Sequence, residues 1–391
     1  MMSMEIKSDE TATLPIAKDH LAPLIGRFGM VQNELAGLLD MPPSTAQSAE
    51  ASGAWWQGLP EEQQHLYRGA LAALASPLLI ADVGMIVRNE RLINTHAVLP
   101  SLRWNDPIYL FAGEENGTQF RLEYLRQADL FTNTLLLHLQ GAAPVYEMEL
   151  KFTIPVRDFA VLLAAVDLRQ RLRYKALLDH AVLPVAYRNE AIAAAVTEGF
   201  TFPDPRWLLP FCLPALHLKH DDAAPASTQE SLGRLVTTGL LKRDGDSITF
   251  PEPGERFAES VCARSSCIRI DTYGADAQGT PGRQSVVLIR GEHFLWYAGM
   301  SGRKAGTMVV TPIGLDQAEV LLKELFTPLA EPKPKQRDAV RPAPAVVQAP
   351  APAAAPQKDV APGGVRKFCL SCGKPLKPGL KFCSNCGAKI T

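Results

Sequence analysis

The chain has 391 residues, in which 40 lysines and arginines nearly balance 41 aspartates and glutamates, for a formal net charge of −1. This length exceeds what one ordinary hydrophobic core serves, so we expect two domains, or one pseudo-symmetric body, with attachments. The near-neutral charge does not indicate a protein that coats nucleic acid or a membrane surface.

The N-terminal residues do not have the pattern of a signal peptide. They carry charged side chains where an apolar stretch is required, and no cleavage site follows. The most apolar run, residues 69–87, is interrupted by Pro77 and Asp82, and it predicts a core helix followed by a strand, not a membrane span. We therefore expect a cytoplasmic protein.

Two stretches have the pattern of antiparallel hairpins. Residues 108–124 predict a strand, a Gly/Asn turn and a second strand, and residues 286–298 repeat that arrangement. Each hairpin carries a Gly-Glu pair at its turn and follows another strand candidate, at 84–88 and at 267–272. This order predicts an internal duplication.

The duplication implies an α+β fold. The openings at 4–7 and 148–151 also match, as Met-Glu-Ile-Lys and Met-Glu-Leu-Lys. We expect a first half over 1–145 and a second over 146–327, with hairpins that share one sheet or form two abutting sheets.

The second half begins with a predicted helix. Asp158 is positioned to cap its start, and its apolar positions recur near the helical period, at Phe159, Leu162, Leu163, Val166 and Tyr174. The basic residues of this stretch scatter around the axis, so we predict a solvated face at Arg169, Arg171, Arg173 and Lys175.

Residues 228–263 resemble the last helix and wing of a winged-helix domain, because a helix, a strand, an Asp-Gly turn, a strand and another helix follow in order. Winged-helix proteins often bind DNA. Here the cations Arg234, Lys242 and Arg243 are countered by surrounding carboxylates, whereas a DNA-reading wing needs net positive charge. The charges therefore favour a structural or protein-contacting role for this segment over DNA binding.

Residues 328–365 are rich in proline and alanine and contain no aromatic residue. We predict a disordered linker that proline holds semi-extended at roughly 3 Å per residue. Such a linker suits a tethered recognition module better than part of an active site.

The chain ends in a cysteine cluster at 366–391, with two Cys-x-x-Cys pairs formed by Cys369, Cys372, Cys383 and Cys386. Each pair directs two sulfurs at one ion, and two pairs complete the tetrahedral shell that zinc favours. An iron centre and a redox dithiol are the alternatives. Four sulfur ligands leave no position for substrate, so we expect one structural Zn²⁺.

Residues 366–389 resemble the short zinc-ribbon family found at the ends of many bacterial proteins. The resemblance implies a module that binds DNA, RNA or protein, without deciding which. The segment 366–391 carries six lysines and arginines and no acid, so phosphate and acidic protein are both possible partners.

The body resembles the cytosolic chaperones of type VII secretion systems, which cradle helical substrate pairs before export. The resemblance rests on the repeated helix, strand and hairpin order and on the stretch 291–314. It implies a protein-binding body, and we transfer no binding residues from that family.

Other candidate sites are weaker. His217 and His220 precede Asp221 and Asp222 without a clear further ligand, and Cys262 and Cys267 are predicted to be small buried thiols. The sequence contains no nucleophile elbow, phosphate loop or His-Glu-x-x-His motif.

These observations favour a non-catalytic adaptor or chaperone whose body binds one protein and whose ribbon binds a second partner. The first alternative is a nucleic-acid-associated regulator that uses the winged-helix-like segment and the basic ribbon. The second is an enzyme whose site is assembled from scattered residues.

Overall fold

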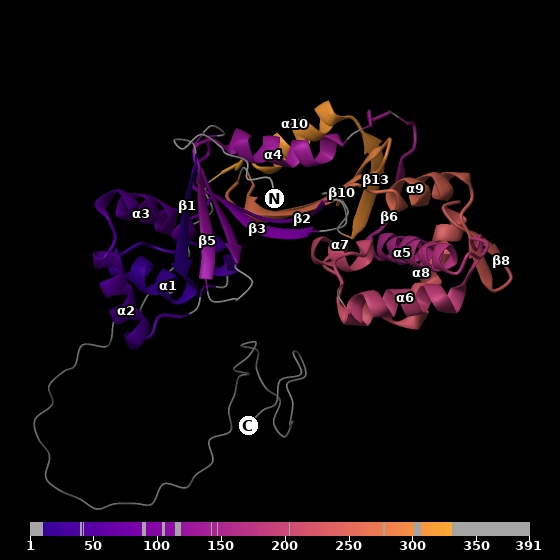
Figure 1. Ribbon diagram of the computed structural model, residues 1–391, viewed down its shortest axis with the longest axis horizontal. Helices are drawn as coiled ribbons and strands as arrows, with labels where there is room; N and C mark the ends of the chain where they lie inside the picture. Colours follow the sequence, from indigo (N-terminus) through magenta and orange to yellow (C-terminus); the bar gives the residue numbers. More distant parts are fainter. Residues whose placement is uncertain are drawn as a thin grey trace, which may run out of the picture. The chain divides into compact units, whose positions relative to one another are not determined.

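The computed structural model of the chain describes residues 11–330 except 40, 42, 88–90, 104–105, 114–118, 142, 147, 203, 277 and 301–305 (Figure 1). The chain divides into two compact units, residues 1–335 and 336–391. The fold below is that of the first unit.

The described part of the first unit is built on one antiparallel sheet of ten strands in the order β1-β5-β4-β3-β2-β10-β11-β12-β13-β6. The strands are β1 (Thr11–Ala17), β2 (Leu79–Val87), β3 (Arg91–Leu99), β4 (Ile108–Gly113), β5 (Gln119–Leu125), β6 (Phe152–Pro155), β10 (Ser266–Ala275), β11 (Pro281–Arg290), β12 (Leu295–Met300) and β13 (Thr307–Ile313). The order is symmetric about the β2–β10 pair, which confirms an α+β fold with two pseudo-repeated halves that share one sheet.

Both predicted hairpins form, as β4–β5 and β11–β12, but their expected equivalence is wrong by one strand. In the symmetric order, β4–β5 corresponds to β12–β13, because β3 lies between β2 and β4. The earlier strand candidates, now β2 and β10, do occupy equivalent central positions. The opening at 4–7 lies outside the described residues.

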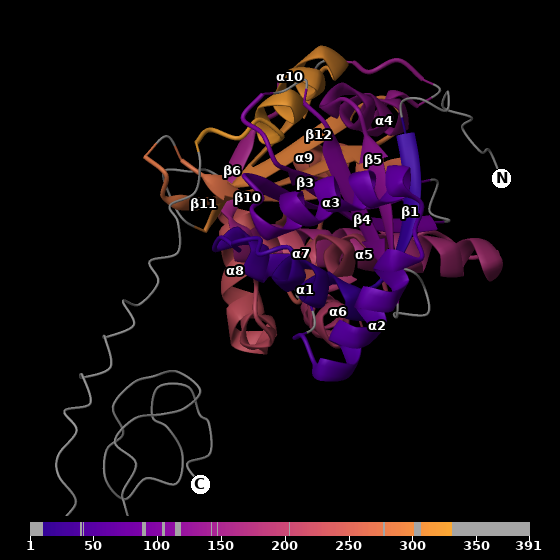
Figure 2. The same ribbon diagram turned by 90° about the vertical axis from the view of Figure 1, so that its left-hand side faces the viewer.

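Helices cover the sheet in three groups (Figures 1 and 2). One face carries α4 (Ala128–Gln140) and α10 (Leu315–Leu325). The first half contributes α1 (Lys18–Arg27), η1 (Leu35–Leu39), α2 (Ala46–Gln57) and α3 (Glu61–Ala75), beside β1 and β5. The second half contributes α5 (Val156–Leu178), α6 (Asn189–Thr201), α7 (Leu208–Leu216), η2 (His220–Ala223), α8 (Pro225–Thr237) and α9 (Glu252–Cys262), at the other end.

The core follows the alternation of side chains along the strands. On β10, Ile268 and Ile270 pack into the apolar cluster beneath α4 and α10, whereas Cys267 packs into the cluster with α5–α9. The apolar run at 69–87 forms the end of α3 and β2, as predicted. None of the helices in the described ranges has the length and apolar character that a bilayer crossing requires.

Helix α5 is the central element of the second helical group. Its residues from Phe159 to Val166 are all buried, which is typical of a helix surrounded by protein on every side. The prediction that Asp158 caps this helix is wrong. Pro155 occupies the N-cap position, and the Asp158 carboxylate instead accepts hydrogen bonds from Arg234 of α8.

The predicted helix-and-wing unit is present as α8, β8 (Lys242–Asp244), β9 (Ser247–Thr249) and α9. Gly245 turns the wing with a φ of 57°, a left-handed conformation that favours glycine. A short strand that the sequence did not indicate, β7 (Tyr187–Arg188), pairs with β9 and completes a three-stranded sheet.

The start of the predicted linker is packed on the body. Pro328 is buried, and Ala330 forms an isolated bridge with Ala275 at the end of β10. The half boundaries at 145 and 327 and the linker over 328–365 stay predictions.

Candidate functional site

The largest run of exposed apolar side chains in the described chain lies where α5 ends. Leu178, Val182 and Val185 expose 81%, 93% and 80% of their surface. We call the whole set the apolar segment, formed by Tyr174, Leu177, Leu178, Val182, Leu183 and Val185. A run of exposed apolar side chains of this kind is typical of interaction sites, because water solvates apolar surface poorly.

The backbone holds this segment in a fixed conformation. His180 follows the helix end with a φ of 50°, and the N–H of Ala181 donates to the carbonyl of Ala176 at 2.8 Å, as in a Schellman motif. Further along, the hydroxyl of buried Tyr187 donates to the carbonyl of Pro184 at 3.0 Å. A surface ordered in advance loses little entropy when a partner binds.

A pocket of about 380 Å³ opens beside the apolar segment, and we call it the wing pocket. Leu183, Pro184 and Val185 form one wall. Phe250, which follows β9, also lines the pocket and packs edge-on against Tyr187 with ring centroids 5.9 Å apart. The pocket therefore offers apolar and aromatic surface to a partner's side chain.

Two arginines of α5 give the wing pocket its charge. Arg169 donates from Nη2 to Oε1 of Glu255 at 2.6 Å, and this hydrogen bond raises the pKa of Arg169. Arg173 lies one helical turn further on and makes no side-chain hydrogen bond or ion pair within the described residues. Arg169 is thus neutralised, and Arg173 supplies a net positive charge at the rim.

The solvated face predicted for these basic residues holds only in part. Arg169 and Arg171 are paired with Glu255 and Glu198, and their side chains are largely covered. Arg173 and Lys175 are exposed, as expected.

The predicted zinc ligands Cys369, Cys372, Cys383 and Cys386 lie outside the described residues. Cys262 and Cys267 are buried thiols, as predicted. Burial raises the pKa of Cys262 to about 11, so this thiol is a poor nucleophile at neutral pH.

The histidine and aspartate stretch at 217–222 is dispersed in the structure. Nε2 of His217 lies 2.9 Å from Oγ of Ser285, and Asp222 pairs with Arg157. No group of three or more metal-ligating side chains occurs among the described residues.

His217 belongs to a polar cluster on the sheet that sequence reasoning missed. Ser285 on β11 donates its hydroxyl to the buried carboxylate of Asp271 on β10, and Arg283 lies 3.3 Å from the same oxygen. The same nitrogen, Nε2 of His217, lies 2.9 Å from Oγ of Ser285 and 3.4 Å from Oδ1 of Asp271, whereas a catalytic histidine faces the serine and the carboxylate with different ring nitrogens. This arrangement suits an anchor for the α7 end better than an active serine.

Sequence reasoning also missed the apolar segment. The run Leu-Leu-Asp-His-Ala-Val-Leu-Pro-Val at 177–185 has apolar side chains without a helical or alternating period once α5 ends. An aperiodic apolar run that follows a helix was the available signal.

Comparison with known proteins identifies the end of the chain. The zinc-ribbon domain family matches residues 368–390, a range that includes all the tail cysteines. No curated protein matches the chain. The donors in that range fit the metal, since thiolates at Cys-x-x-Cys spacing form the usual shell of structural zinc. The tail therefore carries a zinc-ribbon domain, which implies a structural zinc ion.

Proposed function

We propose that this protein is a non-catalytic cytoplasmic adaptor or chaperone. Its body binds one protein partner through the apolar segment and the wing pocket, and its tethered zinc ribbon binds a second partner. The observation that carries the proposal is the exposed, conformationally fixed apolar segment at the end of α5.

Burial of the apolar segment by a partner supplies ample free energy. Transfer of each large aliphatic side chain out of water contributes about 1.5 to 3 kcal/mol. Leu178 and Val182 are almost fully exposed and therefore have most of that contribution to give. They are the expected centre of the interface.

The charge at the wing pocket defines the partner's chemistry. Arg173 and Lys175 are exposed beside the apolar segment. Between Asp167 and the end of α5 at Leu178, the helix contains no acidic residue. A complementary partner presents apolar side chains next to aspartate or glutamate, since opposite charges at the rim steer association.

The ribbon extends this interaction to a second partner. We propose Cys369, Cys372, Cys383 and Cys386 as the zinc ligands, because they are the donors in the matched domain. Tethering by a linker of suitable length raises the effective concentration of a second contact to about the millimolar range. Body and ribbon together thus bring two molecules into one complex.

The alternative use as a nucleic-acid regulator makes a different prediction. The wing exposes Lys242 and Arg243, but Asp244 and Asp246 are exposed on the same hairpin. Binding to phosphates weakens steeply between about 50 and 200 mM salt, whereas an apolar interface is nearly insensitive. A salt titration of the complexes therefore separates the two functions.

The test is affinity purification of the full chain from its own cells, followed by quantitative mass spectrometry. Replacing Leu178 and Val182 by serine is expected to reduce one group of co-purified proteins at least about tenfold. Replacing Cys369 and Cys372 by serine is expected to deplete a different group.

Val31→Ser is the matched control, because Val31 is an isolated exposed valine on the other half of the body, 65% exposed. It is expected to retain both groups of proteins. If the Leu178 and Val182 variant retains every partner, the apolar segment is not the body's interface and the proposal fails.

A further inference from the structure

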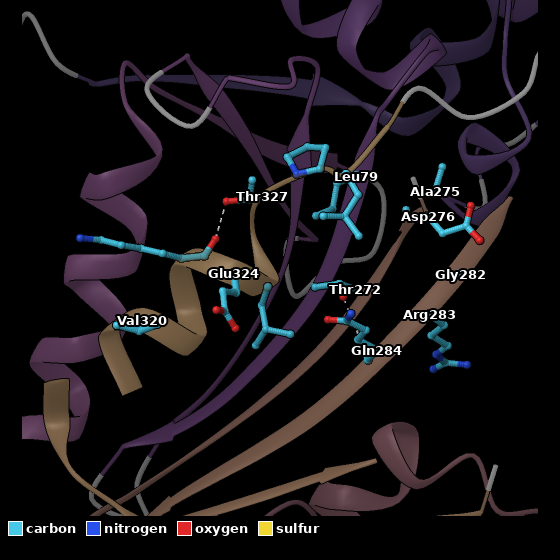
Figure 3. A pocket seen from close by; sticks show the side chains of 15 residues that line it. Leu79, Thr272, Ala275, Asp276, Gly282, Arg283, Gln284, Val320, Glu324 and Thr327 are labelled. Carbon is cyan, nitrogen blue, oxygen red and sulfur yellow. Dashed lines mark hydrogen bonds between the residues drawn. The ribbon is translucent and has the colours of Figure 1, made fainter. Parts of the chain in front are cut away.

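A second cavity lies where α10 ends, on the face of the sheet that carries α4 and α10. It has a volume of about 680 Å³, within the usual range for small-molecule sites. Figure 3 shows strands β10 and β11 along one side and α10 along the other. Leu79, Val320, Leu325, Pro328 and Leu329 give it an apolar lining.

Two glycines form the part of its floor that lies on the strands. Gly274 of β10 and Gly282 of β11 are cross-strand partners, and both line the cavity. They share the sheet face of Ile270 and Val286, which pack toward α4 and α10. At Gly274 and Gly282, therefore, no side chain projects from the strands into the cavity.

Neither glycine is required by the protein's own packing. A Cβ on Gly282 would meet nothing described within 4 Å, and one on Gly274 would make only ordinary contacts of 3.6 Å or more. Neither residue has a positive φ. Glycine weakens a strand interior, and its use there is typical of a site where another molecule approaches the backbone.

The polar lining of the cavity contains two carboxylates, two cations and three uncharged side chains. Figure 3 shows the Thr272 hydroxyl and the Gln284 side chain at the strands, with Glu324 on the helix side and Asp276 on the hairpin side. Glu324 is exposed and makes no side-chain hydrogen bond or ion pair with the described residues. Its carboxylate is therefore available to a ligand.

The nearby cations are neutralised by other groups. Lys323 donates from Nζ to Oε1 of Glu319 at 2.7 Å. Arg283 lies 3.3 Å from Asp271 and contacts the carbonyl of Pro214 on the other face of the sheet. The cavity thus combines apolar walls with a net negative rim.

We propose that this cavity binds a small organic cation, a molecule with an apolar body and an ammonium group. The apolar body lies on Gly274 and Gly282, and the ammonium group is held at the acidic rim by Glu324. At Gly274 the strand β10 is paired with β11 on one side and with β2 on the other, so it has no free backbone groups there with which to bind a peptide as an added strand.

Calorimetric titration of the full chain with phenylbutylamine, phenylbutanol and phenylbutyrate tests this proposal. These probes share one apolar skeleton and differ in charge. The amine is expected to bind at least about tenfold more tightly than the carboxylate, because the rim is acidic. Glu324→Gln is expected to weaken amine binding about two- to fivefold and to leave the alcohol unchanged.

Gly282→Val tests the floor, because a Cβ there meets nothing described within 4 Å and the added side chain takes up space in the cavity. It is expected to abolish amine binding while the melting temperature stays equal or rises, and Gly282→Ala is expected to give a smaller loss. The controls are Thr153→Val at an exposed position of β6 and Glu259→Gln at an exposed position of α9, and both are expected to bind as the wild type does.

Three results would overturn the proposal: no binding of the amine, equal binding of amine and carboxylate, or binding that Gly282→Val and Gly282→Ala leave unchanged in a folded protein. Preferential binding of a lysine-containing apolar peptide over the free amine would also overturn it.

Discussion

Arg234 and Asp158 join the end of α8 to the first turn of α5, with Nη2 of the arginine donating to Oδ1 at 2.7 Å and Nε donating to Oδ2 at 2.9 Å. Asp158 is buried, whereas the arginine reaches the surface. Arg234→Ala leaves the buried carboxylate without its cation, so we expect a loss of about 3 kcal/mol in the free energy of unfolding, measured by urea denaturation.

Arg256→Ala is the matched control for this prediction. Arg256 pairs with Glu252 on α9, and both side chains are more than half exposed. Loss of such a surface pair costs under about 0.5 kcal/mol. Equal effects of the two substitutions would show that the Asp158 contact is no stronger than a surface pair.

A second prediction concerns two helical glycines. A Cβ on Gly254 of α9 would lie 1.9 Å from the carbonyl oxygen of Leu240, which belongs to the backbone and cannot turn away. Gly254→Ala is therefore expected to lower the free energy of unfolding by more than about 2 kcal/mol.

Gly233 of α8 provides the opposite case, since a Cβ there would meet nothing described within 4 Å. Gly233→Ala is expected to stabilise the protein by about 0.5 to 1 kcal/mol, because alanine is the better helix former. Thermal unfolding of both variants checks the pair. A stable Gly254→Ala protein would mean that α9 can move away from Leu240.

Local patterns predicted the elements of this fold well. The apolar run at 69–87, the pairing of β4 with β5 and the Asp-Gly wing turn all depend on neighbours in sequence. The α+β class with two related halves followed from the order of those elements.

Long-range contacts explain what the sequence did not reveal. Strand β3 was not predicted, and without it the two hairpins were matched one strand out of step. Asp158 has the position of a cap, but Arg234 lies 76 residues away in sequence and binds its carboxylate instead. Likewise, the cavity beside α10 depends on Gly274 and Gly282 being paired in register, which no local pattern reveals.

A third prediction concerns pH and Asp167, a buried residue that caps α7. Its Oδ1 accepts the N–H of Leu208 at 2.9 Å, and its Oδ2 accepts the N–H of Leu209 at 2.8 Å. Burial raises the pKa of Asp167 to about 6, although these hydrogen bonds and the charge of Arg264 oppose the shift. The folded state therefore holds this proton more tightly than the unfolded state.

The sign of the effect follows from proton linkage. Stability from Asp167 is fully present below its unfolded pKa near 3.8 and is lost as the pH rises through about 6. We expect the free energy of unfolding of the wild type, relative to Asp167→Asn, to fall by about 3 kcal/mol over this window. Urea unfolding of both proteins at a series of pH values is the measurement, and parallel pH profiles would contradict it.

The last prediction concerns the metal of the tail. A zinc ribbon is too small to bury a sufficient core, so metal binding and folding are coupled, and the ion is held by thiolates. We expect one zinc ion per chain by native mass spectrometry, lost in the Cys369→Ser, Cys372→Ser double variant. The melting transition of the body should not change, because the ribbon belongs to a separate compact unit.

Cys262→Ser is the control, since Cys262 is buried in the body among the α5 and α9 contacts, and this variant should retain the zinc. Retention of zinc by the double variant would mean that the ion is bound elsewhere. A wild-type chain without metal would contradict the proposed role of the ribbon in binding a second partner.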